Sequence, residues 1–361
     1  MRFSKRSGRL RSMSLRSGPS RRLRALAALL AVVVIAMLAT GGEAFAVTWD
    51  SPDGIYGTGS ATYSLGPVSQ AFQGSVGLAV WHSATINQIY FSYGGNTPFQ
   101  VGNATTYVAP TAVAWGNNNF AVFSVGTNQN VYWTFTTNGN PGNPASWSQW
   151  VQVNAAGNPQ TSDPVDVTQL GRGSNDLYLV WRGANANTTI YGSYFNGDYW
   201  ATVESIGGST DDAPSITYNS VSQALWVAVR GGGGGTWLNS QNLGNASWNG
   251  WYEVGGGPVY GSAPAIQAQG AIQEVNGTEE QCMTLGETDS NRTFNYTEVT
   301  PYGTTSNWVR DPSGWVTNYN VNLSSPQAGP SAGTTFGLIN GTNLNDAVGV
   351  IEGNNQGYCT T

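Results

Sequence analysis

The sequence is poor in charge, and beyond its first 46 residues it contains no lysine at all. From Val47 onward five arginines stand against nineteen acidic residues, which gives this part a net charge of −14. An acidic chain with so few cations lacks the positive patch that binds phosphate backbones or anionic lipid head groups. We therefore expect neither nucleic acid nor a membrane surface as partners. The surface must consist of amides, hydroxyls and aromatic rings, which suit neutral, hydroxyl-rich ligands.

Histidine is scarcer still, since His82 is the only one in the chain. A single histidine gives little support to a Ser-His-Asp relay, and no cluster of residues has the spacing of metal ligands. The five glycines at 231–235 are not followed by Lys-Ser or Lys-Thr, so they do not form a phosphate-binding loop. We expect no metal and no cofactor. His82 ends an apolar segment, and we expect it to be a surface or packing residue.

Only two cysteines are present, Cys282 and Cys359. If the chain is exported, both enter an oxidising compartment, where a disulfide can form. Such a bond would close a loop of about 76 residues and stabilise the fold by up to roughly 4.5 kcal/mol. Both cysteines also lie in apolar segments that suit strands, so two buried thiols are the alternative.

The first 46 residues differ from the rest in charge and hydropathy. Nine Lys or Arg side chains stand within the first 24 residues, an apolar run follows, and Ala44 to Ala46 form the small-x-small pattern of a signal peptidase site. We predict a signal peptide over residues 1–46, a mature chain from Val47, secretion, and no membrane insertion after cleavage. A retained membrane anchor is the alternative.

Helical periodicity is missing after residue 46, because glycine and proline interrupt every window long enough to hold a helix. What recurs instead is a unit of about 50 residues. It opens at a proline, continues with an apolar segment ending in Arg-Gly and an aromatic segment, and closes on tryptophan and a double glycine. The clearest copies carry LYLVWRG at 177–183 and ALWVAVRG at 224–231. The units start at Pro67, Pro110, Pro164, Pro214 and Pro264.

Four short extended segments in each unit are typical of a β-propeller blade. Five continuous units precede a last segment that is one strand short, and VTWD at 47–50 supplies the missing tryptophan-bearing strand. We predict one all-β domain over residues 47–361, a six-bladed β-propeller whose last blade is closed by the N-terminal strand pairing with residues 357–361. Seven blades are the alternative, because the fifth unit runs 66 residues from Pro264 to Pro330.

The order of these features resembles the repeat of bacterial propeller lectins that bind fucose and related sugars. The features are the small residue plus proline, the Arg-Gly strand, the WSQW sequence at 147–150 and the double glycine, and the match is best over residues 110–257. The resemblance implies a propeller that binds glycans between adjacent blades. The chain departs from that repeat after Arg-Gly, where Ala184 and Asn185, or a run of glycines, replace an expected aspartate.

A sugar site needs an aromatic plate for the apolar face of the ring and amide, hydroxyl or guanidinium groups for its hydroxyl rim. The candidates are Trp150, Trp200 and Trp251 as plates and Arg182 and Arg230 as donors. Repeated positions are equally typical of packing, so the alternative is that these tryptophans pack blade against blade and that the arginines stack on rings or cap turns. We expect Trp147 and Trp248, the first tryptophans of their pairs, in the core.

We expect a secreted, non-enzymatic, lectin-like protein that binds neutral glycans through repeated weak sites. One alternative is a propeller glycosidase or polysaccharide lyase with carboxylates such as Asp163 and Asp212 in the central channel. Both aspartates stand just before a proline, so turn capping is the role that we expect for them. A sialidase is disfavoured, because the S-x-D-x-G-x-T-W turn is absent. The other alternative is a protein-interaction scaffold of the cell envelope.

Overall fold

The structure is a computed structural model that describes residues 68–310 with short gaps, and four strands outside that span. The gaps are residues 74–75, 84–85, 95, 172–173, 245–246, 256–261, 269–272, 276–277, 290–293, 304 and 306–307. The chain divides into two units, Met1–Ala46 and Val47–Thr361, and every described residue belongs to the second. None of the described residues forms a helix with the length and apolar character needed to cross a membrane.

The described regular elements are antiparallel β-strands and one short 3₁₀ helix, η2 (Pro144–Ser146). Five four-stranded sheets follow one another along the chain. Sheet 1 contains β3 (Ser69–Gln73), β4 (Val76–His82), β5 (Gln88–Tyr93) and β6 (Phe99–Thr105). Sheet 2 contains β7 (Thr111–Trp115), β8 (Asn119–Val125), β9 (Val131–Phe135) and β10 (Val151–Gln152). Sheet 3 contains β11 (Asp166–Gln169), β12 (Asp176–Arg182), β13 (Thr189–Asn196) and β14 (Glu204–Ser209).

The later part of the chain continues this pattern. Sheet 4 contains β15 (Ser215–Asn219), β16 (Ala224–Arg230), β17 (Thr236–Asn242) and β18 (Tyr252–Glu253). Sheet 5 contains β19 (Ala265–Ala268), β22 (Met283–Thr288), β23 (Phe294–Val299) and β24 (Val309–Arg310). Between its first two strands the hairpin of β20 (Gln273–Val275) and β21 (Thr278–Glu280) is inserted, so part of the extra length of the fifth unit belongs to this hairpin.

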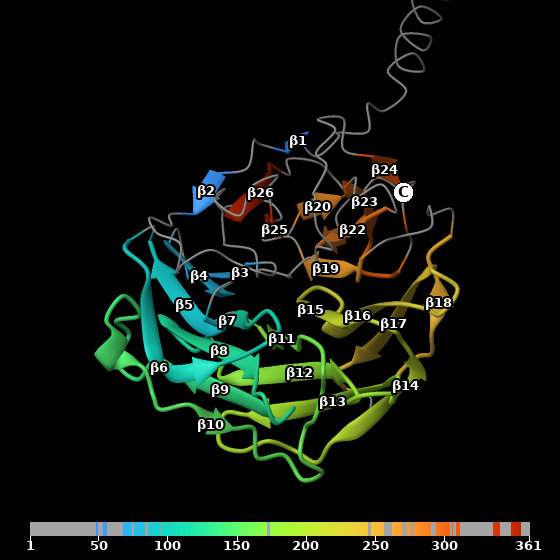
Figure 1. Ribbon diagram of the computed structural model, residues 1–361. Coiled ribbons are helices and arrows are strands. Elements are labelled where there is room, and N and C mark those ends of the chain that lie inside the picture. Colours follow the sequence, from blue (N-terminus) through green and yellow to red (C-terminus); the bar gives the residue numbers. More distant parts are fainter. Residues whose placement is uncertain are drawn as a thin grey trace, which may run out of the picture. The chain divides into compact units, whose positions relative to one another are not determined.

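The first strands of the five sheets lie next to one another: β3 contacts β7, β7 contacts β11, β11 contacts β15, and β15 contacts β19. Figure 1 shows the sheets as successive sectors around a common centre, from blue to orange, with the first strand of each sheet innermost and the fourth at the rim. Neighbouring sheets are therefore arranged side by side around that centre, as the blades of a propeller are.

The sheets pack through side chains that alternate along each strand. In β8, Phe120 and Val122 belong to a buried cluster shared with sheet 1, whereas Phe123 and Val125 belong to a cluster shared with sheet 3. Both phenylalanines are fully buried, and burying a side chain of this size stabilises the fold by about 1.5–3 kcal/mol. Because both faces of the second strand are buried, its sequence is mostly apolar, as NFAVFSV in β8 shows.

Buried polar side chains at one register position also link the first strands of neighbouring sheets. Ser69 Oγ accepts a hydrogen bond from Ala112 N (2.9 Å), Asp166 Oδ2 from Ile216 N (2.9 Å), and Ser215 Oγ from Ile266 N (3.1 Å). Asp166 Oδ2 also accepts from the Ser215 hydroxyl (2.9 Å). Burial nevertheless raises the pKa of Asp166 to about 7. These bonds fix the sheets against one another near the centre.

The remaining strands form a sixth sheet. It contains β1 (Thr48–Trp49), β2 (Asp53–Ile55), β25 (Thr335–Ile339) and β26 (Val348–Asn354). The N-terminal strand thus joins the last strands of the chain, with Thr48 opposite Asn354 and Trp49 opposite Gly353. The partner that we predicted, residues 357–361, lies outside the described residues. The all-β class is confirmed, and the blade count and the closure of the ring stay predictions.

Cys282 lies immediately before β22 and is 3% exposed. Its predicted partner, Cys359, lies outside the described residues. The disulfide therefore stays a prediction.

Candidate functional site

Arg182, the first candidate donor, ends β12 and faces the start of its own sheet and of the next. Its guanidinium donates to Asp163 Oδ2 (2.6 Å), to the Thr210 carbonyl (2.9 Å) and to the Asn185 carbonyl (3.2 Å). The side chain is only 12% exposed. In this geometry Arg182 holds the entry segments of two neighbouring sheets together.

Arg230 forms the equivalent ion pair with Asp212 one sheet later. Burial raises the pKa of Asp212, and the positive charge of Arg230 opposes that rise. The turn capping that we expected of the aspartates is performed by threonines: Thr161 Oγ1 accepts from Asp163 N (3.0 Å) and Thr210 Oγ1 from Asp212 N (3.2 Å). The repeat therefore pairs each Arg-Gly with a Thr-x-Asp sequence, a signal that is visible in the sequence.

Trp200, one of the three candidate plates, lies in the core. It is 7% exposed and packs against Phe123, Trp133 and Phe195. Its register explains this position, because Trp200 forms a β-bridge with Phe195 just as Trp147 does with Thr136 at the equivalent place of sheet 2. Trp200 is thus the counterpart of the buried first tryptophan of the pair. Our prediction of Trp200 as a binding plate was wrong on this ground.

Trp150 and Trp251 share a different position, directly before β10 and β18, and both are partly exposed. Each leans toward the last strand of the preceding sheet. The Trp150 indole nitrogen donates to the Val101 carbonyl of β6 (2.8 Å). A Cβ on Gly208, in β14, would lie only 2.5 Å from the Trp251 indole nitrogen. These two tryptophans therefore reach from their own sheet to the preceding one, as the glycan-site hypothesis requires.

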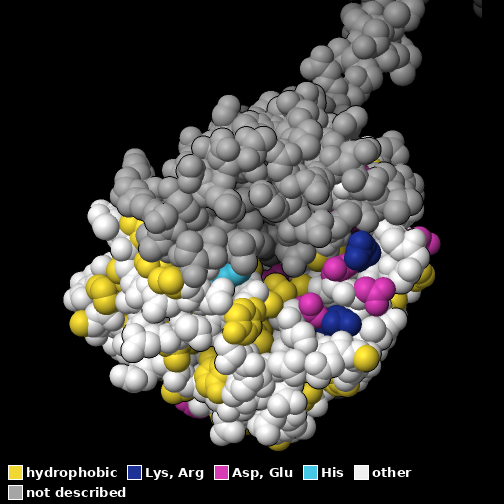
Figure 2. Space-filling model, viewed as in Figure 1, with side chains coloured by type: hydrophobic (Ala, Val, Ile, Leu, Met, Phe, Trp, Pro, Cys, Tyr) yellow, Lys and Arg dark blue, Asp and Glu magenta, His cyan; other side chains and the backbone are white. Residues whose placement is uncertain are grey.

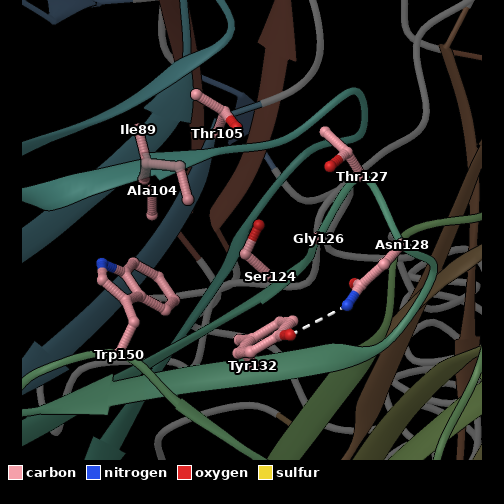
Figure 3. Close-up of a pocket in the computed structure, with 9 residues that line it drawn as sticks. All are labelled: Ile89, Ala104, Thr105, Ser124, Gly126, Thr127, Asn128, Tyr132 and Trp150. Atoms are coloured by element: carbon pink, nitrogen blue, oxygen red, sulfur yellow. Dashed lines mark hydrogen bonds between the residues drawn. The ribbon is translucent and has the colours of Figure 1, made fainter.

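Two pockets lie between neighbouring sheets, and we call the space between two such sheets a groove. Pocket A, between sheets 1 and 2, has a volume of about 310 Å³. Its lining residues are Ile89, Ala104 and Thr105 from sheet 1 and Ser124, Gly126, Thr127, Asn128, Tyr132 and Trp150 from sheet 2 (Figure 3). Pocket B, between sheets 3 and 4, has a volume of about 360 Å³. Its lining residues are Gly208 and Ser209 from sheet 3 and Val229, Gly231, Gly232, Gly233, Gly235, Trp237, Trp251 and Glu253 from sheet 4.

Pocket A combines rings with uncharged polar groups. Figure 3 shows Tyr132 and Trp150 on one side of the space and Ala104 and Thr105 on the other, with Ser124 between them. The Ser124 hydroxyl is buried and has no hydrogen-bond partner among the described residues. Asn128 Nδ2 donates to the Tyr132 hydroxyl (3.0 Å) and so holds the ring in place. The pocket therefore offers a flat apolar surface beside an unsatisfied hydroxyl.

The two pockets occupy the same place in the repeat. Ser124 lies opposite Tyr132 in sheet 2, and Val229 lies opposite Trp237 in sheet 4, each pair one residue before the end of the second strand. Trp150 and Trp251 stand at matching positions before the fourth strand. Trp150 and Trp251 were predicted from the sequence, whereas the pairs Ser124–Tyr132 and Val229–Trp237 were not. The recurrent aromatic near the start of the third strand was the available signal for Tyr132 and Trp237.

The surroundings of the pockets carry little charge. Figure 2 shows that Lys and Arg side chains on the drawn face lie beside Asp and Glu, and that much of the surface is uncharged. Pocket A has no charged lining residue, and pocket B has one, Glu253. Neither arginine candidate lines either pocket. In the part of the chain that the structure describes, no group of three His, Cys, Asp or Glu side chains is placed to hold a metal ion.

His82 ends β4 at the position that Arg182 occupies in β12. It is 2% exposed, and burial lowers its pKa to about 4. Of the two roles that we expected, surface or packing, it has the packing role.

Comparison with known proteins finds similar folds among solved structures but no similar sequence in a described family. The sequence matches no protein-family model and no curated protein. Among solved structures it is similar to a lectin of Aleuria aurantia, described as a six-bladed β-propeller with a novel fucose recognition mode, with a TM-score of 0.53 and 12% identity over 78% of this chain and 92% of that one. It is also similar to the SapL1 lectin in complex with α-methyl fucoside (TM-score 0.56, 10% identity, 81% and 97% covered). A third is AofleA of Arthrobotrys oligospora (TM-score 0.55, 10% identity, 83% and 89% covered). At such identities the likeness concerns the fold alone, and it supports a β-propeller fold like the one described for the Aleuria aurantia lectin.

Proposed function

We propose that this protein is a secreted, six-bladed β-propeller lectin that binds neutral glycans and has no catalytic activity. The observation that carries the proposal is the repeated pocket: pockets A and B lie at the same register position of two grooves. Both offer aromatic rings next to small or uncharged polar groups. A binding site that recurs with the structural repeat is the expected design of a multivalent lectin.

The chemistry of the pockets suits a sugar ring. A pyranose presents C–H groups on one face and hydroxyls at its rim, so it needs a flat ring beside hydrogen-bonding groups. Pocket A supplies the rings of Tyr132 and Trp150 and the hydroxyls of Ser124, Thr105 and Thr127. Its volume of about 310 Å³ is at the lower end of the range of about 300–1,000 Å³ for small-molecule sites. One monosaccharide residue of a longer glycan is the ligand of this size.

Six blades and a closed ring are part of the proposal. Five four-stranded sheets and the sheet of β1, β2, β25 and β26 make six sheets of four strands among the described residues. One solved neighbour, the lectin of Aleuria aurantia, is described as six-bladed. Joining the chain ends in one blade removes open sheet edges that would otherwise recruit other chains.

The geometry favours binding over catalysis at the carboxylates that a glycosidase would use. Asp163 and Asp212 are each paired with an arginine, Arg182 and Arg230. Neither aspartate lines pocket A or pocket B, so neither is placed to act on a sugar bound there. The pockets that could accept a sugar contain one carboxylate between them, Glu253 in pocket B, whereas glycoside hydrolysis ordinarily needs two.

A glycan array, followed by isothermal titration with neutral methyl glycosides that include α-methyl fucoside, tests the function. We expect binding of neutral sugars, and a scaffold protein without a sugar site would bind none of them. Hydrolysis of nitrophenyl glycosides by the wild type, abolished in Asp163→Asn or Asp212→Asn, would favour the enzyme instead.

Trp150→Ala tests the site. Loss of one ring contact should weaken binding at pocket A roughly three- to tenfold, since aromatic contacts contribute about 0.5–1.5 kcal/mol. Tyr199→Ala is the matched control, because Tyr199 is 65% exposed and lines neither pocket. Equal affinities of the two variants would contradict pocket A as a sugar site.

A further inference from the structure

One position of the repeat differs sharply between sheets. It is the next-to-last residue of the second strand, which lies directly opposite an aromatic residue of the third strand. The four pairs are Trp81 with Tyr90, Ser124 with Tyr132, Trp181 with Tyr191, and Val229 with Trp237. The aromatic partner is thus present in all four sheets, whereas the opposite residue is a tryptophan in sheets 1 and 3 and a small residue in sheets 2 and 4.

Where that residue is tryptophan, the indole covers the aromatic partner. Trp181 stacks on Tyr191 with ring centroids 6.0 Å apart and an interplanar angle of 23°, and Trp81 stacks on Tyr90 at 6.1 Å and 19°. Trp81 and Trp181 are 1% and 2% exposed. These indoles therefore fill the space over the ring within the fold itself.

Where that residue is small, the space over the ring is a pocket. Ser124 and Tyr132 both line pocket A, and Val229 and Trp237 both line pocket B. The two pockets are thus the places where a stacking partner is missing from the chain. The repeat retains the aromatic platform, and only the covering side chain differs.

Resting on the proposed function, we propose that a sugar ring stacks on Tyr132 in pocket A and on Trp237 in pocket B, in the place that Trp181 and Trp81 take in their own sheets. The indole of Trp181 is then a ligand mimic built into the chain, and it indicates a sugar plane nearly parallel to the platform ring. Grooves covered by their own tryptophan bind no sugar. The residue at this position decides whether a groove is a site.

The fifth sheet lacks the aromatic residue on which a sugar could stack. Its residue at this position is Glu287, opposite Asn295, so no aromatic platform exists. Glu287 is fully buried and accepts a hydrogen bond from Thr236 of sheet 4. Among the grooves entered by these five second strands, only those of pockets A and B combine a platform with an uncovered face.

The two open sites also differ in polarity. The Ser124 hydroxyl at pocket A is buried and lacks a partner among the described residues, and it would have to turn toward the pocket to bind a hydroxyl of a sugar stacked on Tyr132. Pocket B has Val229 at that position and the exposed carboxylate of Glu253 nearby. We expect pocket A to contribute a hydrogen bond from this position that pocket B lacks.

Ser124→Trp and Val229→Trp test the proposal. Each should fill one pocket and remove one sugar site per chain, and the double variant should remove both. Sites are counted in crystals soaked with α-methyl fucoside, or with the glycoside of the panel that the wild type binds best, and affinity is followed by titration. Ser124→Ala is the matched control: it keeps pocket A open, and loss of one hydrogen bond should weaken that site only about three- to tenfold.

The reverse change, Trp181→Ser, should uncover Tyr191 and add a sugar site between sheets 2 and 3. If Trp181→Ser does not fold, the substitutions Ser124→Trp and Val229→Trp still test the proposal. Unchanged occupancy of both pockets in a folded Ser124→Trp, Val229→Trp double variant overturns the proposal while leaving the lectin function standing. A wild-type protein that binds no glycan of the array overturns both.

Discussion

Arg182, which we predicted to donate hydrogen bonds to a sugar, instead donates them to groups of the chain itself. Three of its N–H groups are bound to Asp163, to the Thr210 carbonyl and to the Asn185 carbonyl. A carboxylate left without its arginine in a partly buried site is costly, because the charge keeps only part of its hydration. The repeated Arg-Gly signature is therefore explained by folding.

Arg182→Ala should lower the free energy of unfolding by about 1–3 kcal/mol, because Asp163 and the Thr210 carbonyl both lose a donor. Sugar affinity should stay within about twofold of the wild type, since Arg182 lines neither pocket. Urea unfolding and titration measure the two effects. Loss of binding with full stability would restore Arg182 as a sugar ligand.

Buried carboxyl groups make stability depend on pH. Burial raises the folded-state pKa of Asp166 to about 7 and that of Glu287 to about 8, both above the ordinary values of 3.8 and 4.5. Between the ordinary and the raised pKa the folded chain binds more protons than the unfolded chain, so stability falls as pH rises. Burial lowers the pKa of His82 to about 4, so this residue acts in the opposite direction below pH 6.5.

As the pH rises above 6.5, His82 becomes neutral in the unfolded state as well, and the two carboxyl groups dominate the pH dependence of stability. We expect the free energy of unfolding, and with it the melting temperature, to fall between pH 6.5 and pH 8. Each group lowers the free energy of unfolding by up to about 1.4 kcal/mol per pH unit while it is protonated only in the folded state. Glu287→Gln and Asp166→Asn should each flatten part of that slope in calorimetric scans. A melting temperature that rises over this range in the wild type would contradict the assignment.

At the scale of strands, the sequence predicted best those strands that are buried on both faces of their sheet. The second strands at 177–183 and 224–231 were predicted from continuous apolar runs, and β12 and β16 lie there. The segment before the fourth strand was harder to interpret, because DYW at 198–200 contains a single tryptophan, whereas the equivalent segment of sheet 2 contains two. Only the bridge from Trp200 to Phe195 shows that it matches Trp147. The pockets were beyond prediction for a different reason: they exist where Ser124 and Val229 are too small to cover a ring, and a missing side chain leaves no motif.

The β14 strand offers a test of how closely Trp251 packs on the preceding sheet. Gly207 and Gly208 both have positive φ, +78° and +72°, but only Gly208 lies against another side chain, the Trp251 indole. Gly208→Ala and Gly207→Ala should each cost about 1 kcal/mol in stability from backbone strain. Gly208→Ala should in addition displace Trp251 and weaken sugar binding at pocket B, with pocket A unchanged. Equal occupancy of pocket B in crystals of both variants would show that this contact does not shape the site.

At the scale of the whole molecule, the proposal depends on a ring of sheets in which each groove is held by its neighbours. The first strands contact one another in order from β3 to β19, and β25 of the sixth sheet contacts β3. β26 pairs with β1 and with β2, so the N-terminal strands complete the sheet formed by the last ones. In a closed propeller this shared sheet closes the ring, because backbone hydrogen bonds within it link the N-terminal strands to the C-terminal ones.

Removal of residues 47–56 from a chain that starts at Val47 should therefore destabilise the sixth sheet. β26 would lose the partners that β1 and β2 provide, and an unpaired strand recruits other chains. We expect a lower melting temperature and self-association that increases with protein concentration, measured by differential scanning fluorimetry and by light scattering after size exclusion. The matched control is the chain from Val47 with all strands present, which should stay monodisperse. A truncated chain that melts at the same temperature and stays monodisperse would show that the N-terminal strands are not needed to close the ring of sheets.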